Sequence, residues 1–428
     1  MIGVALSLLA LLIALSLPIG AVLVVLGLIL SHFYSAFPLW RAIGETSWNA
    51  ATDTVIVCVP MFILMGELLL RSGIADGLYT AMVRWLSWVP GGIMHANVGA
   101  ATLFAATSGS SAATAATIGT VAMPEMKRYR YDPKLFLGSI AAGGTLGILI
   151  PPSINLVVYG VLTQTSIPKL YLAGFLPGFL LSALFMSTIL LGCLIFPHLD
   201  GERRKFNLRE AVSVLPGLVP PVALFLIVVG TIYAGIATPT EASSMGVVAA
   251  LLLAALRGRL SWSVLATACE GTVRTTAMIM LIFVAAFFLN FVIATTGLTR
   301  ALNDVIVNLG WTPLQTMIAI IIFYLILGCF METMAMMITT IPVIAPLVVS
   351  MGYDPVWFGI VIVVLVEAAM ITPPVGVNLY IVHGIRRDSG SLNEVIIGAS
   401  PFVIAMCVLL GLLIAFPDIA LILPKFFE

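Results

Sequence analysis

The chain has 428 residues, of which 61% are hydrophobic and only 9% are charged, with equal numbers of basic and acidic side chains. A soluble domain carries roughly 25% charged residues, so most of this surface must face lipid, and the composition predicts an all-α polytopic membrane protein. The net charge of zero gives no sign of a nucleic-acid partner. The five cysteines lie in apolar segments without metal-ligand spacing, which predicts small buried side chains.

Apolar runs follow one another along the chain. They fall near residues 4–31, 51–70, 93–124, 134–163, 169–197, 214–236, 241–256, 275–296, 313–349, 356–383 and 395–424. A simple crossing needs about 20 apolar residues. The runs at 93–124 and 313–349 are too long for one crossing and too short for two, which predicts re-entrant helical hairpins. The sequence SGSSAAT at 108–114 marks the first turn, and GCFMETMA at 328–335 marks the second.

Amphipathic stretches with tryptophan lie between these runs, at 37–49 and 78–89, and a third candidate covers 260–274. Tryptophan prefers the headgroup level of a bilayer, so each stretch is predicted to form a helix lying in the membrane interface. Ordinary loop helices are the simpler alternative.

Two proline pairs interrupt apolar runs, Pro151-Pro152 within 134–163 and Pro373-Pro374 within 356–383. Proline lacks a backbone donor and clashes with the preceding turn, so each pair predicts a broken helix. Freed backbone groups at membrane depth are tolerated only where they are buried in protein or line a wet cavity. Paired breaks in two halves of a chain are typical of the binding site of a secondary transporter.

The two halves repeat each other at a shift of 222 positions. Tyr131-Asp132-Pro133 then falls on Tyr353-Asp354-Pro355, and both proline pairs coincide. Chance matching of apolar residues does not readily place prolines and a tripeptide in register. The sequence therefore predicts two repeats, 1–210 and 211–428, each with scaffold helices, a hairpin and a broken helix.

Loop charge predicts how the repeats are oriented. Basic residues flank the first hairpin, whereas the segments 308–313 and 350–355 around the second have none. By the positive-inside rule the first hairpin opens to the cytoplasm and the second to the outside, so the repeats are inverted. The basic residues used are Arg84, Lys127, Arg128, Arg130 and Lys134, with Arg203, Arg204, Lys205, Arg209, Arg386 and Arg387 in further loops.

Each hairpin tip is expected to face a broken helix, and the two together would offer hydroxyl and carbonyl oxygens. These suit a hard cation such as sodium, although small residues at a tip also serve close helix packing. The candidate oxygen donors are Ser108, Ser110, Ser111 and the carbonyls around Gly147, Ile150 and Pro152 in the first half, and Glu332, Thr333 and Thr372 in the second.

The half-helices after the breaks begin with free amides and partial positive charge, which favour an anionic substrate. Asn155 and Asn378 follow the breaks and either orient that substrate or cap their own helices. Glu332 and Glu367 are acids at apparent membrane depth, which is costly unless they are paired or functional. For Glu367 the alternative is a structural role in which it only links two elements. Glu67 is also assigned a structural role.

Motifs of metalloproteases, serine hydrolases and phosphate-binding loops do not occur in the sequence, so the chain is not expected to be an enzyme. Without an ATPase element, uphill transport must depend on an ion gradient or a partner protein. A membrane scaffold is the alternative from another class, and the paired breaks argue against it.

The motifs GGTLGILIPPSI, ITPPVGVNLYI, LGCFMETMAM and the two YDP positions resemble the large membrane subunit of tripartite ATP-independent periplasmic (TRAP) transporters. The resemblance runs across essentially the whole chain. It implies a sodium-driven elevator in a bacterial inner membrane, with a small four-helix membrane subunit as a separate chain. It also implies a periplasmic binding protein that delivers an organic acid, such as a sialic acid or a C4-dicarboxylate.

Carried over by position, the resemblance implies two sodium sites. The first would use Ser108, Ser111, Gly147, Ile150 and Pro152, and the second Gly328, Thr333 and Thr372. Ser110, Asn155, Glu332 and Asn378 are the candidates for substrate contact; many relatives have Asp where this chain has Glu332. A stand-alone ion-coupled dicarboxylate carrier of similar architecture is the alternative.

Overall fold

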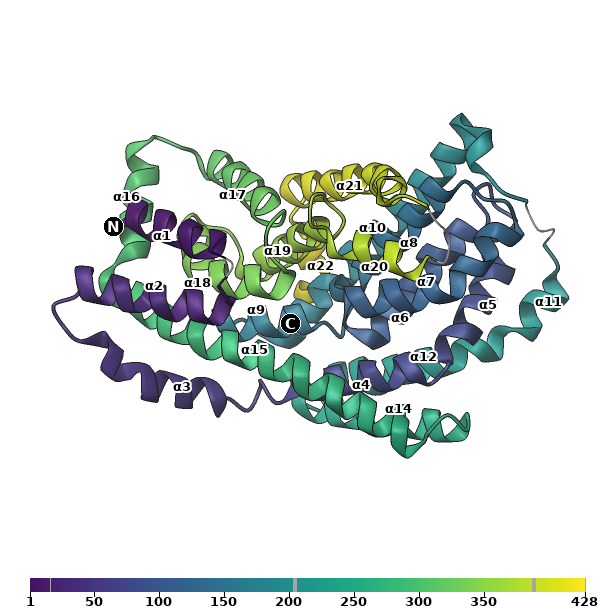
Figure 1. Ribbon diagram of the computed structural model, residues 1–428, viewed down its shortest axis with the longest axis horizontal. Helices are drawn as coiled ribbons and strands as arrows, with labels where there is room; N and C mark the ends of the chain where they lie inside the picture. The colour runs from purple at the N-terminus through teal and green to yellow at the C-terminus, as the bar shows by residue number, and fades with distance from the viewer. Residues whose placement is uncertain (16, 203–205, 387–389, 428) are drawn as a thin grey trace.

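The computed structural model describes residues 1–15, 17–202, 206–386 and 390–427, and all regular elements in these ranges are helices (Figure 1). The predicted all-helical class is confirmed. Six helices in this part of the chain are long and apolar enough to cross a membrane, or up to eight if each of two bent pairs is one span. Arg203, Arg204, Lys205 and Arg387 lie outside the described residues.

The first apolar run that suits a hairpin forms α6 (Ile93–Ser108) and α7 (Ser111–Arg128), which pack against each other. Only Gly109 and Ser110 separate them, and Gly109 has a φ of 61°, a conformation that favours glycine. The second run forms α17 (Pro313–Leu327) and α18 (Thr333–Ser350). The polar segments at 108–114 and 328–335 thus contain the turns between these helices.

Both proline pairs interrupt their helices. α8 (Pro133–Leu149) and α9 (Ile154–Thr163) meet at a bend of 41°, and α19 (Pro355–Met370) is followed by α20 (Val377–Ile385) after six residues. Both Pro-Pro peptide bonds are cis. The two breaks differ in exposure, because residues 150–153 are buried, whereas residues 373–375 are exposed.

Boundaries in the two halves fall at matching positions. α7 begins at Ser111 and α18 at Thr333, which are 222 positions apart, and their last residues are separated by the same interval. Asp132 and Asp354, also 222 positions apart, cap α8 and α19 by accepting backbone N–H bonds in front of a proline at the first turn.

The broken helices lie at the centre of the protein. Residues 135–149 of α8 and 356–370 of α19 are all buried, as expected for helices that are apolar on every side. α8 packs closely on α21 (Leu392–Ala415), because a Cβ atom at Gly138 would lie only 2.0 Å from the carbonyl oxygen of Gly398. Paired glycines that bring two backbones together are typical of helix packing in membranes.

A layer of long helices runs along one side of the molecule (Figure 1). Its main member is α15 (Trp262–Thr296), which contacts α2 (Ile19–Tyr34), α3 (Ile43–Ala51) and α4 (Cys58–Arg71). With 35 residues α15 is about 50 Å long, more than the ~30 Å of a hydrocarbon core. The prediction of a separate interface helix at 260–274 is wrong, because no proline or other break interrupts α15 there.

The other helices complete the layer and the surroundings of the core. α4 and α5 (Ile74–Leu86) form a bent pair at 69°, and α12 (Val219–Phe225), a π-helical turn at 226–230 and α13 (Thr231–Tyr233) continue one another. The remaining α-helices are α1 (Ile2–Ala14), α10 (Ile167–Ile195), α11 (Leu208–Ser213), α14 (Pro239–Leu256), α16 (Leu298–Asn308) and α22 (Asp418–Phe426).

Candidate functional site

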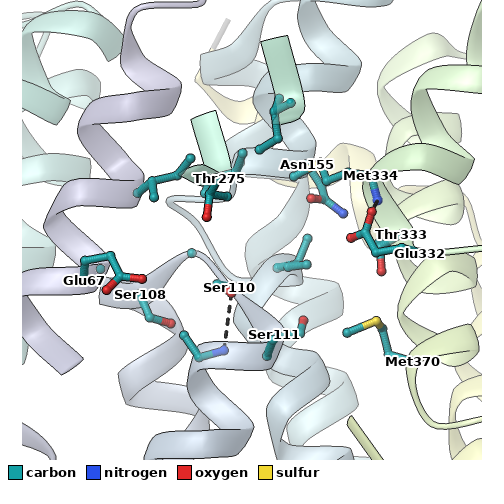
Figure 2. Close-up of a pocket in the computed structure, with 18 of the residues that line it drawn as sticks. Glu67, Ser108, Ser110, Ser111, Asn155, Thr275, Glu332, Thr333, Met334 and Met370 are labelled. Carbon is teal, nitrogen blue, oxygen red and sulfur yellow. Dashed lines mark hydrogen bonds between the residues drawn. The ribbon is translucent and has the colours of Figure 1, made fainter. Parts of the chain in front are cut away.

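A cavity of about 170 Å³ lies where the first turn, the start of α9 and the second turn meet α4 and α15 (Figure 2). Six of the predicted site residues line it: Ser108, Ser110, Ser111, Asn155, Glu332 and Thr333. Figure 2 shows the serines of the first turn on one side and Glu332 and Thr333 reaching in from the second turn. Segments more than 200 residues apart in the chain therefore place polar side chains in one cavity.

The first turn packs tightly against its neighbours through glycines. A Cβ atom at Gly147 of α8 would lie 2.6 Å from the carbonyl oxygen of Ser110, and one at Gly109 would lie 3.0 Å from the carbonyl oxygen of Pro152. On the other side, a Cβ atom at Gly66 of α4 would lie 2.8 Å from the carbonyl oxygen of Ser108. The turn is thus held between α4 and the first break. The cavity wall does not include the three residues predicted to offer carbonyl oxygens near the first break, Gly147, Ile150 and Pro152.

The hydrogen bonds of the first turn leave oxygen lone pairs free. Thr114 donates its only hydroxyl proton to the carbonyl of Ser110 at 2.8 Å, so Ser108, 2.8 Å from the same Thr114 oxygen, must be the donor of that second bond. Ser111 donates to the carboxylate of Glu367 at 2.7 Å. Both serine hydroxyls therefore give their protons away and keep lone pairs with which a cation could be bound. Ser108 and Ser111 are buried. The low dielectric of a buried site strengthens the electrostatic interaction of these lone pairs with a cation.

Glu332 and Thr333 have different roles at the second turn. The carboxylate of Glu332 accepts the backbone N–H groups of Met334 and Ala335 at 2.9 and 3.1 Å and so caps α18. The Thr333 hydroxyl is buried and makes no hydrogen bond within the described part of the chain. A buried hydroxyl without a partner is costly, so Thr333 is a group that a ligand could satisfy.

The other residues predicted for the second sodium site lie outside the cavity. A Cβ atom at Gly328 would meet the Cβ of Ala369 at 2.2 Å, so the second turn presses directly on α19. Thr372 donates its hydroxyl proton to the carbonyl of Ala368 at 2.7 Å, which leaves its lone pairs free. Gly328 and Thr372 thus lie at the turn and the break, as the sequence suggests, with neither exposed to the cavity.

The two asparagines occupy different surroundings. Asn155 is fully buried at the start of α9, and neither its amide nitrogen nor its oxygen has a hydrogen-bond partner among the described residues. It lines the cavity, so it can donate to and accept from a bound molecule. Asn378 does not line the cavity; its amide donates to the carbonyl of Ala141 in α8 at 3.2 Å. Neither side chain caps its own helix, and Ser153 caps α9 instead.

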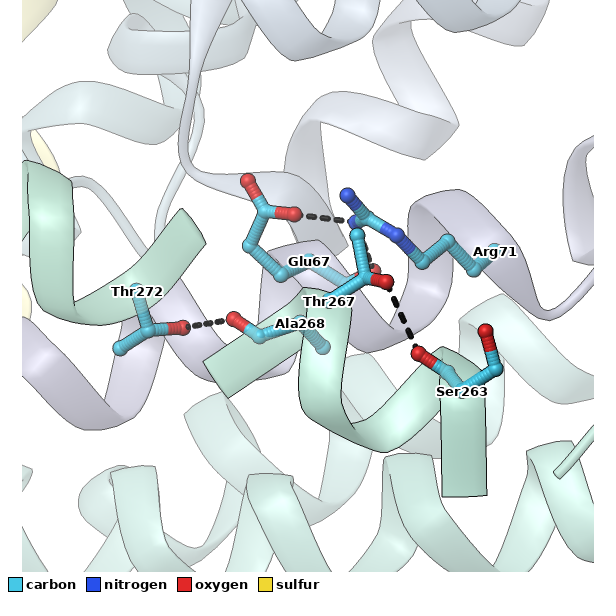
Figure 3. A network of polar contacts seen from close by, with 6 residues as sticks. All are labelled: Glu67, Arg71, Ser263, Thr267, Ala268 and Thr272. Atoms are coloured by element: carbon cyan, nitrogen blue, oxygen red, sulfur yellow. Dashed lines mark hydrogen bonds and ion pairs between the residues drawn. The ribbon is translucent and has the colours of Figure 1, made fainter. Parts of the chain in front are cut away.

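Glu67 also borders the cavity, although the sequence suggested a structural role for it. Its carboxylate pairs with Arg71 one turn further along α4 (Figure 3). Gly271 of α15 leaves room for this pair, since a Cβ atom there would lie 3.0 Å from the carboxyl carbon of Glu67. Glu67 and Glu332 are the charged side chains that line the cavity among the described residues, and no basic side chain lines it there.

Sequence reasoning missed the part of the cavity wall formed by α15 and the end of α19. The missed lining residues include Thr275, Met278, Ile279, Met334 and Met370. Thr275, Met278 and Ile279 carry no local signal, because they lie within a long helix with no break or turn. Met334 lies within the segment 328–335 predicted as the second turn, and Met370 lies three residues before the second proline pair, so both could have been suspected. Thr114, which fixes the proton of Ser108, could have been suspected because it ends the segment 108–114 that contains the three serines of the first turn.

Comparisons with known proteins give a consistent result over the whole chain. A family model described as "Tripartite ATP-independent periplasmic transporter, DctM component" matches residues 6–419. The C4-dicarboxylate TRAP transporter large permease protein DctM of Pseudomonas aeruginosa is 32% identical over 388 residues, 90% of each chain. The sialic acid TRAP transporter large permease protein SiaM of Vibrio cholerae is 30% identical over 378 residues, covering 87% of this chain and 86% of that protein.

Among solved structures, the YdaH transporter of Alcanivorax borkumensis is similar with a TM-score of 0.62 at 14% identity. The similarity covers 96% of this chain and 99% of that one. At this identity the likeness concerns the fold alone.

Proposed function

The chain belongs to the DctM component family of tripartite ATP-independent periplasmic transporters, and from this premise we propose that it imports an organic acid together with sodium across a bacterial inner membrane. It is a multi-pass membrane protein and a transporter component, not an enzyme, since its curated relatives are transporter permeases.

One observation carries the proposal: oxygen atoms and helix N-termini line the cavity, and the charged side chains of its described wall are all acidic. Glu67 and Glu332 are the charged residues of its described wall. Arg71 balances the charge of Glu67, whereas Glu332 has no ion-pair partner among the described residues. A carboxylate substrate entering such a space meets repulsion unless a cation accompanies it. Sodium bound at the turns would supply that positive charge, which links the binding of the acid to the binding of the ion.

Two sodium sites fit the oxygens that the chain offers. The first comprises the hydroxyls of Ser108 and Ser111 with the carbonyls of Gly147, Ile150 and Pro152. The donation of both hydroxyl protons to protein oxygens, which leaves the serine lone pairs for an ion, supports it. The second comprises Gly328, Thr333 and Thr372, and the unpartnered Thr333 hydroxyl supports it. The ion travels with the substrate and is released with it.

The substrate class follows from the helices that end at the cavity. The N-terminal residues of α7, α9 and α18 line it. Helix N-termini carry partial positive charge and favour anionic groups. Ser110, Asn155 and Glu332 are the proposed contacts in the cavity, and Asn378 is a contact only if the two halves move. C4-dicarboxylates and sialic acid, named for the relatives, are both carboxylates and are the first candidates.

An elevator movement of an inverted-repeat unit is the proposed mechanism. The boundaries of α7 and α18 and the capped starts of α8 and α19, all at intervals of 222 positions, support the repeat. The layer of α2, α4, α14 and α15 along one side supports a fixed scaffold (Figure 1). In this proposal the hairpins and broken helices move together against that layer.

Two partners complete the proposed system. The family description names a tripartite transporter, so this chain would be one of three components. We propose a small four-helix membrane subunit on a separate chain and a periplasmic protein that delivers the acid. A stand-alone carrier is the competing possibility, and copurification of a small helical protein with the tagged chain distinguishes them.

Uptake into vesicles tests the function. The chain and the membrane protein that copurifies with it are reconstituted, and the cognate binding protein is loaded with labelled acid, which is chosen by thermal-shift screening. Uptake is expected to require an inward sodium gradient and to stop with a sodium ionophore. Equal uptake with potassium in place of sodium would contradict sodium coupling, and uptake without the binding protein would favour the stand-alone carrier.

A further inference from the structure

Glu367 is a fully buried acid that lies close to the first turn. It belongs to the last turn of α19 in the second half of the chain, yet its Oε2 accepts the hydroxyl proton of Ser111, at the start of α7, at 2.7 Å. Its exposed fraction is 0%, and its other carboxyl oxygen has no hydrogen-bond partner among the described residues. The carboxylate is therefore only half satisfied by the protein.

A buried carboxyl group stays ionised only with a nearby positive charge or a strong network of donors. No Arg, Lys or His in the described ranges forms an ion pair with Glu367. The ionisable group that acts on it through space is Glu332, which has the same sign. The surroundings thus offer Glu367 one hydroxyl and a repelling charge, and they do not explain why an acid is there.

Glu367 belongs to the second half of the chain, and the matching position in the first half is not an acid. The position 222 residues before Glu367 is Thr145, which is fully buried and donates its hydroxyl proton to Ala142 in its own helix at 2.7 Å. The counterpart of Ser111 is Thr333, whose hydroxyl has no partner among the described residues. Of these two matching pairs, only the one at the first turn contains a carboxylate.

Resting on the sodium site proposed above, we propose that Glu367 is a positioning residue for this site. It holds the Ser111 hydroxyl with its lone pairs toward the cation and supplies the negative charge that balances the ion. The Ser111 oxygen is polarised by donating to a carboxylate, as metal ligands are by acidic partners behind them. Since Glu367 comes from the other half of the chain, the site is complete only when the second broken helix is in place.

A sodium titration of thermal stability tests the role of Glu367 without measuring transport. The full chain, purified with the membrane protein that accompanies it, is melted in rising sodium concentrations with potassium as the balancing ion. Glu367→Gln keeps an acceptor for Ser111 and removes the charge, whereas Glu367→Met removes both. Loss of a partner behind a metal ligand typically weakens metal binding 10- to 100-fold. The sodium midpoint is therefore expected to rise about tenfold in E367Q and further in E367M.

Matched variants separate this role from a structural one. Glu45→Gln removes an exposed acid on α3 and should leave the sodium midpoint unchanged. Ser111→Ala combined with E367Q should raise the midpoint by less than the product of the two single effects, because Glu367 acts in part through Ser111. If E367Q does not fold, E367D, with a shorter carboxylate, is expected to raise the midpoint severalfold.

Two outcomes have different meanings. A lower melting temperature of E367Q at every sodium concentration, with a midpoint within twofold of the natural protein, would overturn the role of Glu367 and leave only a structural tie. If the natural protein itself shows no sodium-dependent stabilisation and takes up the acid without sodium, the sodium coupling fails, and the role of Glu367 fails with it.

Discussion

The side-chain amide of Asn378 donates a hydrogen bond to the main-chain carbonyl of Ala141 at 3.2 Å. Asn378 lies at the start of α20, just after the second break, and Ala141 lies in α8, before the first break. Both residues are fully buried. The bond therefore joins the start of the helix after the second break to α8, about two turns before the first break, and the direction of the bond has consequences for substitution.

Replacing Asn378 by Asp is expected to destabilise the protein far more than replacing it by Leu. Asn378→Asp puts an unpaired carboxylate against the Ala141 carbonyl, a loss of about 3–5 kcal/mol, whereas Asn378→Leu loses one ordinary hydrogen bond, about 1 kcal/mol. Thermal melting of the purified protein measures both. Asn393→Asp, at an exposed position, is the control. Equal melting temperatures for the Asp and Leu variants would contradict this assignment of the amide.

Removing oxygen ligands is expected to weaken the sodium dependence of uptake. Ser108→Ala and Thr372→Ala each remove one hydroxyl with lone pairs free for an ion. A lost contact to a charged group is worth about 1.5–3 kcal/mol, so the sodium concentration for half-maximal uptake should rise about tenfold or more in each. Ser187→Ala is the control, since its exposed hydroxyl bonds only to its own helix. An unchanged sodium dependence in S108A and T372A would remove these positions from the sites.

The sequence predicted the helix breaks and turns well because their causes are local. Proline at 151–152 and 373–374 lacks the donor that a helix needs, and glycine at 109 permits the left-handed turn. The oxygens of Ser108, Ser110 and Ser111 were found for the same reason, because they belong to the turn itself. Local rules of this kind depend only on the backbone of a few residues.

Contacts between distant segments could not be read from the sequence. The bond between Ser111 and Glu367 depends on how α19 crosses the first turn, which no spacing in the chain specifies. The cavity wall from α15 depends on the position of a 35-residue helix that looked like two elements. Asn378 resembled Asn155 in its position after a proline pair, but the crossing of α20 and α8 directs it toward Ala141 instead of the cavity.

A methyl group at Gly147 is expected to disturb the first turn. Its Cβ would lie 2.6 Å from the carbonyl oxygen of Ser110 and 2.8 Å from the Thr114 hydroxyl, both closer than carbon atoms normally approach oxygen. Gly147→Ala should therefore displace the turn and raise the sodium midpoint of thermal stabilisation at least tenfold, by the energy of about one ligand contact. A lower overall stability is expected as well.

Gly411→Ala is the matched control for this substitution. It also lies within a helix, but a Cβ atom there would have no neighbour within 4 Å. Alanine favours a helix over glycine by about 1 kcal/mol, so G411A should melt at the same or a higher temperature with an unchanged sodium midpoint. If G147A behaved like G411A, the turn would not be held as closely as the structure shows.

Replacing Thr333 by valine is expected to increase stability without ligand and to weaken ion binding. Valine has nearly the same shape, and it removes a buried hydroxyl that makes no hydrogen bond in the described part of the chain. Removal of such an unsatisfied group is worth about 1 kcal/mol. Sodium-free T333V should therefore melt at a higher temperature than the natural protein, while its sodium midpoint rises about tenfold.

Thr339→Val on the same helix is the control, because the Thr339 hydroxyl donates to the carbonyl of Ala335 at 2.6 Å. This variant should lose stability and keep the sodium midpoint of the natural protein. Opposite shifts in these two variants would follow directly from a hydroxyl kept for a ligand, and a destabilised T333V with normal sodium binding would show that Thr333 serves packing alone.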